Sequence, residues 1–101
     1  DELEWQLARS VALQGRHDEA GAIARQALER MQQRLPATHW RRLLVEAAVK
    51  LPPFVAQAEP QHLGAARAGL DALRTRLGPD AFAVRELESA LAAAQPPAPA
   101  R

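Results

Sequence analysis

The sequence predicts an all-α fold of about five antiparallel helices, arranged as two and a half helix-turn-helix repeats in a short α-solenoid. Three observations favour this fold. Apolar residues recur every three or four positions along most of the chain, which is the spacing of an amphipathic helix. Proline and glycine interrupt this pattern at intervals of about one helix length. The pattern itself returns after 42 residues, and a fixed period of this kind is typical of helical-repeat proteins.

The length and composition allow one small domain. The chain has 101 residues, of which 48% are hydrophobic and only 4% aromatic. A domain of this size holds a single modest core, and the many alanines favour thin, closely packed helices. Because the first residue is Asp1 rather than methionine, we expect the chain to be part of a longer protein.

Composition also excludes several classes of function. The absence of cysteine excludes disulfides, thiolate nucleophiles and zinc-thiolate sites. No apolar stretch approaches the roughly 20 residues that cross a bilayer. Thirteen basic residues are offset by twelve acidic ones, so the formal net charge is +1, which does not indicate a nucleic-acid partner. We therefore expect a cytoplasmic protein that binds neither membranes nor nucleic acid.

The stretch QGRHDEA separates the first two predicted helices. Apolar residues recur at helical spacing on both sides of it, at Leu3, Leu7, Val11, Ile23, Ala27 and Met31. This spacing predicts helices over residues 2–14 and about 19–35. Gly15 is suited to closing the first helix, and Asp18 stands where an N-cap of the second belongs. Glu19 follows in the first turn, where the helix dipole favours a negative charge.

The third predicted helix is followed by a proline-rich connection. Thr38 is the expected cap, and apolar residues continue in phase as far as Leu51. Pro52-Pro53 must stop the helix, because each ring removes a backbone donor and clashes with the preceding turn. We expect the stretch LPPFVAQAEP to form an ordered loop or a single turn.

Two more helices complete the predicted fold. A fourth helix fits residues 61–77 and stops at Gly78-Pro79, after which Asp80 is the expected cap of a fifth. The helical repeat domain therefore covers residues 1–95. The proline- and alanine-rich residues 96–101 are expected to form a disordered tail.

Segments 42 residues apart resemble one another. LEWQL at residues 3–7, VEAAV at 45–49 and LESAL at 87–91 share apolar first and fifth positions and a glutamate at the second. The same offset aligns ALERMQQRL with GLDALRTRL. We therefore interpret the chain as two helix pairs followed by the first helix of a third pair.

The first unit resembles the tetratricopeptide repeat family. The positions that match the pattern of this family are Leu7, Ala8, Gly15, Ala20, Ala27 and Leu28. The 42-residue period and the LGPD stretch at residues 77–80 are similar to the kinesin-light-chain-like variety. The resemblance covers residues 1 to about 94, but LPPFVAQAEP replaces the glycine-containing turn in the second unit. It implies a protein-protein docking module, or scaffold, within a larger signalling or regulatory protein.

The resemblance also implies where a protein or peptide partner lies, namely in a concave groove lined by the first helix of each pair. Carried onto this sequence, the candidate lining residues are Glu2, Trp5, Gln6, Arg9 and Leu13 in the first unit and Leu44, Ala47, Ala48 and Leu51 in the second. The second set is apolar. Either an apolar partner docks there, or Phe54 and Val55 fold back over it. We favour the second alternative, because a large bare patch is a liability for a soluble chain.

No catalytic, cofactor or metal site is predicted. His17 lies between Arg16 and two acidic residues, but side chains at consecutive positions diverge, and the resemblance implies a ring packed between helices at this turn position. His39 and His62 have no partner at ligand spacing. Ser10 and Ser89 fall within predicted helices rather than in a nucleophile turn. We therefore predict that the segment is not an enzyme.

Two other function classes remain open. The arginines form a candidate nucleic-acid surface, but acidic residues interleave with them and no row of exposed aromatic residues is available for base stacking. The alternative to docking is a structural oligomerisation element that buries its helices against a second copy. Trp5 and Trp40 are expected to pack between helices rather than to form a ligand cage.

Overall fold

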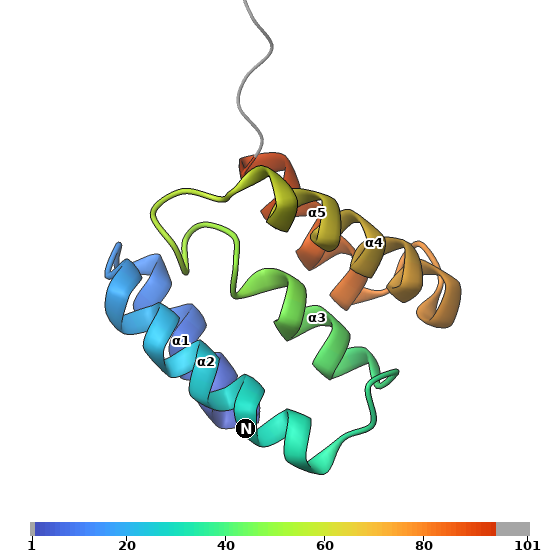
Figure 1. Cartoon of the computed structure of the whole chain (residues 1–101), viewed down its shortest axis with the longest axis horizontal. Coiled ribbons are helices and arrows are strands. Elements are labelled where there is room, and N and C mark those ends of the chain that lie inside the picture. The colour runs from blue at the N-terminus through green and yellow to red at the C-terminus, as the bar shows by residue number, and fades with distance from the viewer. Residues whose placement is uncertain (1, 95–101) are drawn as a thin grey trace, which may run out of the picture.

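The computed structural model describes residues 2–94 and shows five α-helices and no strand over this range. They are α1 (Glu2–Leu13), α2 (His17–Arg34), α3 (Trp40–Ala48), α4 (Pro60–Leu77) and α5 (Phe82–Ala94). The predicted all-α fold is therefore confirmed. In Figure 1, the α1–α2 pair lies on one side of α3 and the α4–α5 pair on the other. The tail expected at residues 96–101 lies outside the described range.

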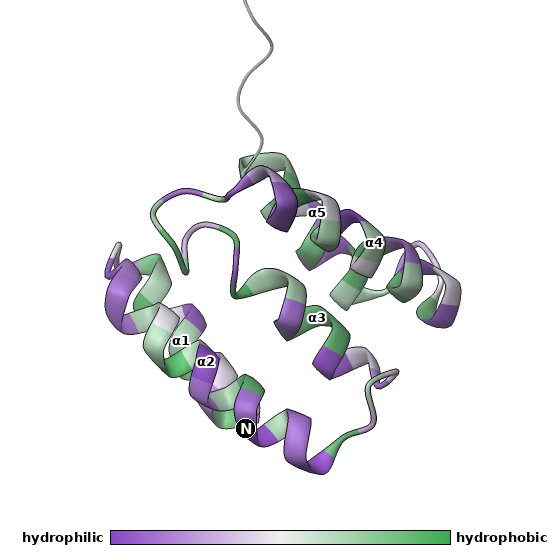
Figure 2. Ribbon diagram, in the orientation of Figure 1, coloured by the Kyte–Doolittle hydropathy of each residue, from purple (hydrophilic) through white to green (hydrophobic). Residues whose placement is uncertain are grey.

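The helices α1 and α2 pack through small side chains. The buried hydrophobic residues of this pair are Trp5, Ala8, Val11, Ala12, Ala20, Ala24, Ala27 and Met31. Because alanine has no side chain beyond Cβ, two helices that meet along an alanine stripe can approach closely. Figure 2 shows apolar and polar residues alternating along each ribbon, as expected for amphipathic helices. Within residues 2–94, no helix combines the length and apolar character that crossing a membrane requires.

The helix α3 takes part in two separate cores. Val45 and Val49 pack into the α1–α2 core, together with Phe54 from the following loop. Leu44 packs instead into a second core with α4 and α5. The largest fully buried side chains of that second core are Leu51, Leu73, Val84 and Leu87. The middle helix therefore joins the two halves of the molecule.

The predicted caps of α2 and α5 are wrong by one or two residues. The helix α2 begins at His17, so Asp18 lies inside its first turn and does not cap it. Its charge still lies at the positive end of the helix dipole. The helix α5 begins at Phe82, and the carboxylate of Asp80 instead pairs with the Arg85 guanidinium at 3.3 Å.

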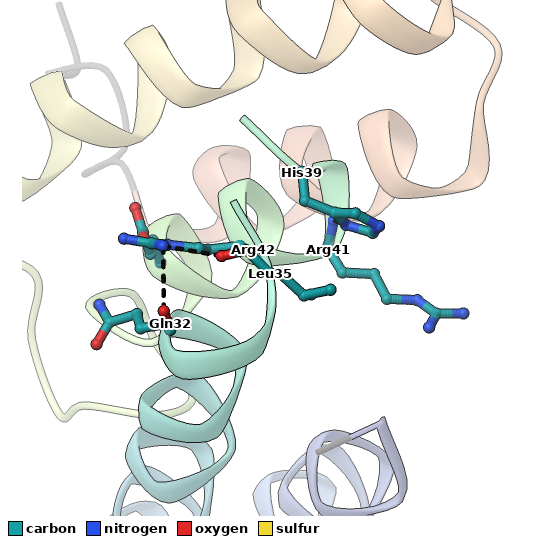
Figure 3. Close-up of polar contacts among 6 residues, drawn as sticks. Gln32, Leu35, His39, Arg41 and Arg42 are labelled. Atoms are coloured by element: carbon teal, nitrogen blue, oxygen red, sulfur yellow. Dashed lines mark hydrogen bonds and ion pairs between the residues drawn. The ribbon is translucent and has the colours of Figure 1, made fainter. Parts of the chain in front are cut away.

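The start of α3 is fixed by side chains that the sequence interpretation did not select. The N-cap is His39 rather than Thr38, and its ring Nδ1 accepts a hydrogen bond from the Arg41 backbone N–H at 3.2 Å. Arg42 donates to the Leu35 carbonyl at 3.1 Å and to the Gln32 carbonyl at 3.5 Å (Figure 3). These carbonyls lie at the end of α2, where no further turn of helix supplies backbone N–H donors. The connection between α2 and α3 is thus tied at both ends.

The helix α3 also ends earlier than predicted. Its last residue is Ala48, and the backbone N–H of Leu51 donates to the Ala48 carbonyl in a turn. The chain then passes through Pro52-Pro53 and reaches back toward the α1–α2 turn (Figure 1). There His17 Nδ1 lies 2.7 Å from the Pro53 carbonyl oxygen. The proline-rich stretch is therefore an ordered loop, as expected, and it is held against the first helix pair.

Candidate functional site

A cleft lies between α1, α3, α5 and the proline-rich loop. It has a volume of about 490 Å³. Its walls are mainly apolar and include Trp5, Leu13, Leu44, Ala48, Pro53, Phe54, Leu87, Ala90 and Ala93. A smaller hollow of about 110 Å³ shares Trp5 and Leu44 with it and extends to Trp40 and Phe82. The first helix of every unit thus contributes one wall.

Most of the candidate groove residues lie on this surface. Those that line the cleft or its extension are Glu2, Trp5, Gln6, Arg9, Leu13, Leu44 and Ala48. The interpretation of Leu51 was wrong, because α3 ends at Ala48 and the following turn buries Leu51 completely in the second core. Ala47 does not line the cleft either. Its methyl faces α4, where a Cβ on Gly69 would lie 3.5 Å away.

An ion pair crosses the cleft from α1 to α5. Arg9 Nη2 lies 2.6 Å from Glu86 Oε1, and the Arg9 guanidinium is also 5.9 Å from the centre of the Phe82 ring. The side chains of Arg9 and Glu86 are 33% and 18% exposed. A pair at this distance and this degree of burial is a charge-assisted contact stronger than an ordinary surface salt bridge. We call this pair the clasp.

Burial makes Glu86 electrostatically unusual. Its carboxylate oxygens are shielded from solvent, and among the described residues Oε2 has no hydrogen-bond partner. Burial raises the pKa of Glu86, and the charge and hydrogen bond of Arg9 oppose this rise without cancelling it. Oε2 is therefore a buried acceptor that is closed to solvent, in keeping with the raised pKa.

Aromatic stacking forms one end of the cleft. The rings of Trp5 and Phe54 have centroids 5.0 Å apart and an angle of 28° between their planes. Both side chains are buried, whereas Val55 is half-buried. Phe54 thus folds back onto Trp5 of α1, whereas we expected Phe54 and Val55 to cover the apolar surface of the second unit. It covers Trp5 but leaves the space along Leu44 and Ala48 open.

The other charges of this surface are also paired. Glu2 pairs with Arg41 at 3.1 Å, and the Arg41 guanidinium lies 5.1 Å from the centre of the Trp40 ring. Trp40 packs against the second core, and Trp5 is buried, so both tryptophans pack between helices as predicted. The pairs of Glu2 with Arg41 and of Arg9 with Glu86 leave the surface without net charge.

The structure places His17 and His39 at helix starts and Ser10 and Ser89 in the cleft. His17 is exposed and bonds the loop, so its ring does not pack between α1 and α2 as the resemblance implied. His39 serves as a helix cap. Ser10 and Ser89 line the cleft from α1 and α5, where hydroxyl groups can donate and accept hydrogen bonds. Within residues 2–94, no three His, Asp or Glu side chains are grouped to hold a metal ion.

The contribution of α5 to the cleft was missed. The 42-residue offset was applied from the first unit to the second but not to the third. Applied again to Leu44, Ala47, Ala48 and Leu51, it gives Glu86, Ser89, Ala90 and Ala93. All four of these α5 residues line the cleft. The repeat therefore contained the signal that identifies the third wall.

The chain matches no protein-family model, no curated protein sequence and no solved structure. The tetratricopeptide resemblance accordingly depends on the matching residues alone and stays a prediction.

Proposed function

We propose that this chain is a non-catalytic protein-protein docking module of the tetratricopeptide-repeat type. The single observation that carries the proposal is the cleft, in which the first helices of three successive units line one apolar hollow of about 490 Å³. Concave, mainly apolar hollows with a few placed polar groups are where proteins receive ligands. The module would serve as a scaffold within a larger cytoplasmic signalling or regulatory protein.

The proposed mechanism is binding to a preformed surface. An apolar side chain of the partner enters between Leu44, Ala48 and Phe54, which already form a wall without a partner. Gln6, Ser10 and Ser89 provide hydrogen bonds around it. Because the walls are fixed by buried packing, little conformational entropy is lost when the partner binds.

The charge distribution supports a protein partner over a nucleic acid. Arginines across the surface pair with carboxylates, for example Arg30 with Glu4 and Arg74 with Glu88. Such pairs leave few free cations to neutralise phosphates, which supply most nucleic-acid affinity. We propose no cofactor and no catalytic reaction for this segment.

A peptide-display selection followed by affinity measurement tests this proposal. Random peptides are selected against the chain, and the best binder is titrated against the wild type and Arg9→Glu. We expect Arg9→Glu to weaken binding at least about 10-fold, because it breaks the clasp and reverses one charge inside the cleft. The matched control is Arg76→Glu, which makes the same charge change at an exposed position near the end of α4.

A charge-swapped double variant distinguishes a loss of binding from a loss of folding. The double variant Arg9→Glu/Glu86→Arg restores the opposite charges of the clasp and should restore stability. If Arg9→Glu and Arg76→Glu reduce the affinity for the peptide equally, or if neither variant reduces it, the cleft is not the docking surface. If no peptide is selected at all, the docking function itself is contradicted.

A further inference from the structure

The clasp lies at the boundary between two apolar spaces. Arg9, Glu86 and the neighbouring Gln6 line both the cleft and the smaller hollow of about 110 Å³, which we call the small hollow. Phe82 lines only the small hollow, and Leu13 lines only the cleft. A partner that fills both spaces therefore has to pass over the clasp.

The two spaces are separated by the length of two residues in an extended peptide. On α1 the small hollow is lined by residues from Glu2 to Arg9 and the cleft by residues from Trp5 to Leu13. The midpoints of these stretches are about four residues apart on α1, and those on α5 about five, which is roughly 5 to 8 Å along a helix. Alternate side chains on one face of an extended peptide lie about 6.5 to 7 Å apart. Side chains at positions i and i+2 of such a peptide therefore match the two spaces.

The two spaces differ in size and thus in the side chain that each admits. The small hollow is lined by the rings of Trp5, Trp40 and Phe82. Its volume of about 110 Å³ is less than the roughly 150 Å³ of a cavity that holds benzene, so it fits a small aliphatic side chain. The cleft, at about 490 Å³, has room for an aromatic ring against Leu44 and Ala48.

Unpaired polar side chains along the cleft favour an extended partner over a helical one. Arg9 donates to the Gln6 side-chain oxygen at 3.1 Å, and within residues 2–94 the Gln6 NH₂ group and the hydroxyls of Ser10 and Ser89 have no partner. An extended peptide brings backbone carbonyls that can accept from them. A helix, including each helix of a second copy, uses its carbonyls internally and would bury these donors unsatisfied.

We propose that the cleft and the small hollow together bind an uncharged, extended peptide segment that passes over the clasp. An aliphatic side chain enters the small hollow, and an aromatic ring two positions away enters the cleft. Both anchors are uncharged, because the charges that line the two spaces are already paired, Arg9 with Glu86 and Glu2 with Arg41. This inference rests on the proposed docking function and names the partner chemistry of the same site.

A short peptide with blocked ends tests the spacing. The probe is Ser-Val-Ser-Trp-Ser, acetylated and amidated, titrated against the whole chain by NMR. We expect a dissociation constant below about 1 mM, raised at least about 10-fold when glycine replaces either the valine or the tryptophan. The scrambled peptide Ser-Ser-Val-Trp-Ser should bind as weakly as these, because adjacent side chains of an extended peptide face opposite ways.

Two exposed side chains assign each anchor to its space. Phe82 is 72% exposed and lines only the small hollow, whereas Leu13 is 88% exposed and lines only the cleft. In double-mutant cycles, Phe82→Ala should reduce the affinity that the valine adds and leave the contribution of the tryptophan unchanged. Leu13→Ala should do the reverse. Because both side chains are exposed, each variant is expected to stay folded, which circular dichroism checks.

Failure of this inference is distinct from failure of the docking function. Equal binding of the alternating and scrambled peptides, or no binding of the alternating peptide up to about 1 mM, overturns the inference. So does coupling of the tryptophan to Phe82 and of the valine to Leu13. Peptides that are selected by display and bind the cleft without this pattern also contradict it, but they leave the docking function in place.

Discussion

Single residues fix the position of the proline-rich loop. A Cβ added to Gly21 would lie 2.5 Å from the carbonyl oxygen of Phe54, so α2 needs a glycine where the loop crosses it. The loop is also held by His17 through the Pro53 carbonyl. The Trp5–Phe54 stack, and with it one end of the cleft, depends on this close approach.

We expect Gly21→Ala to destabilise the chain by about 1–2 kcal/mol, because the added methyl must displace backbone atoms. Gly64→Ala is the control. Gly64 is also helical, but a Cβ there meets nothing within 4 Å, so alanine should stabilise the helix by about 0.5–1 kcal/mol. Urea unfolding measures both changes. Stabilisation by Gly21→Ala would show that the loop does not cross α2 in this way.

The raised pKa of Glu86 predicts that the stability of the chain depends on pH. Because burial raises its pKa, the folded chain holds this proton more tightly than the unfolded chain. Ionisation of Glu86 therefore costs stability as the pH rises from the ordinary glutamate range through the raised folded value. Glutamine at position 86 cannot ionise. The free energy of unfolding of Glu86→Gln should therefore rise relative to that of the wild type between about pH 4 and pH 7.

The measurement is urea unfolding of both proteins across this pH range. The control is Glu88→Gln, a more exposed carboxylate on the same helix that pairs with Arg74. An equal gain in Glu88→Gln would show that burial of Glu86 is not the cause. If the wild type instead becomes more stable relative to Glu86→Gln as the pH rises, the attraction of Arg9 outweighs the cost of burial.

At the scale of elements, the departure of the second unit from the repeat shapes the cleft. The helix α3 stops at Ala48, and the residues that follow form the loop wall instead of another turn of helix. Phe54 then replaces part of a helical surface with an aromatic ring stacked on Trp5. The proline-rich loop thus forms one wall of the cleft.

Phe54→Ala should destabilise the chain by about 3–4 kcal/mol, because it removes a buried aromatic side chain and leaves a cavity beside Trp5. Val55→Ala is the control, and it should cost at most about 1 kcal/mol because Val55 is only half-buried. Thermal or urea unfolding distinguishes the two. Equal costs would contradict a specific role of the Trp5–Phe54 stack.

The helices themselves could be predicted from the sequence, but their ends could not. Apolar spacing located all five helices, because a helix must bury one continuous stripe. The caps at Asp18, Thr38 and Asp80 were wrong, because the residue that caps a helix depends on local backbone angles as well as residue type. His39 caps α3 through a ring nitrogen, a choice that the usual preference for small polar caps does not indicate.

The cleft could be predicted in part. The resemblance suggested its α1 residues, and the 42-residue offset extended them to Leu44 and Ala48 of α3, since equivalent positions face the same way in each unit. It gave Leu51 wrongly, because Pro52-Pro53 break the helix that the offset assumes. The clasp between Arg9 and Glu86 depends on how far the units rotate relative to one another, and spacing along one sequence does not contain that angle.

At the scale of the whole molecule, two cores are joined around one cleft. The helix α3 joins the two cores, because Val45 packs into the α1–α2 core and Leu44 packs into the core with α4 and α5. The clasp adds a second connection between the two ends of the repeat. These connections hold the walls of the cleft at a fixed separation, which is what a preformed docking surface requires.

The central claim is that this cleft receives a protein segment, and mapping the bound peptide by NMR tests it most directly. The ¹⁵N-labelled chain is titrated with the peptide obtained by display, and the amide shifts are followed residue by residue. We expect the largest shifts at Gln6, Arg9 and Ser89, on two facing walls of the cleft. Shifts confined to the hollow between α4 and α5, around Arg67 and Asp71, would contradict the claim.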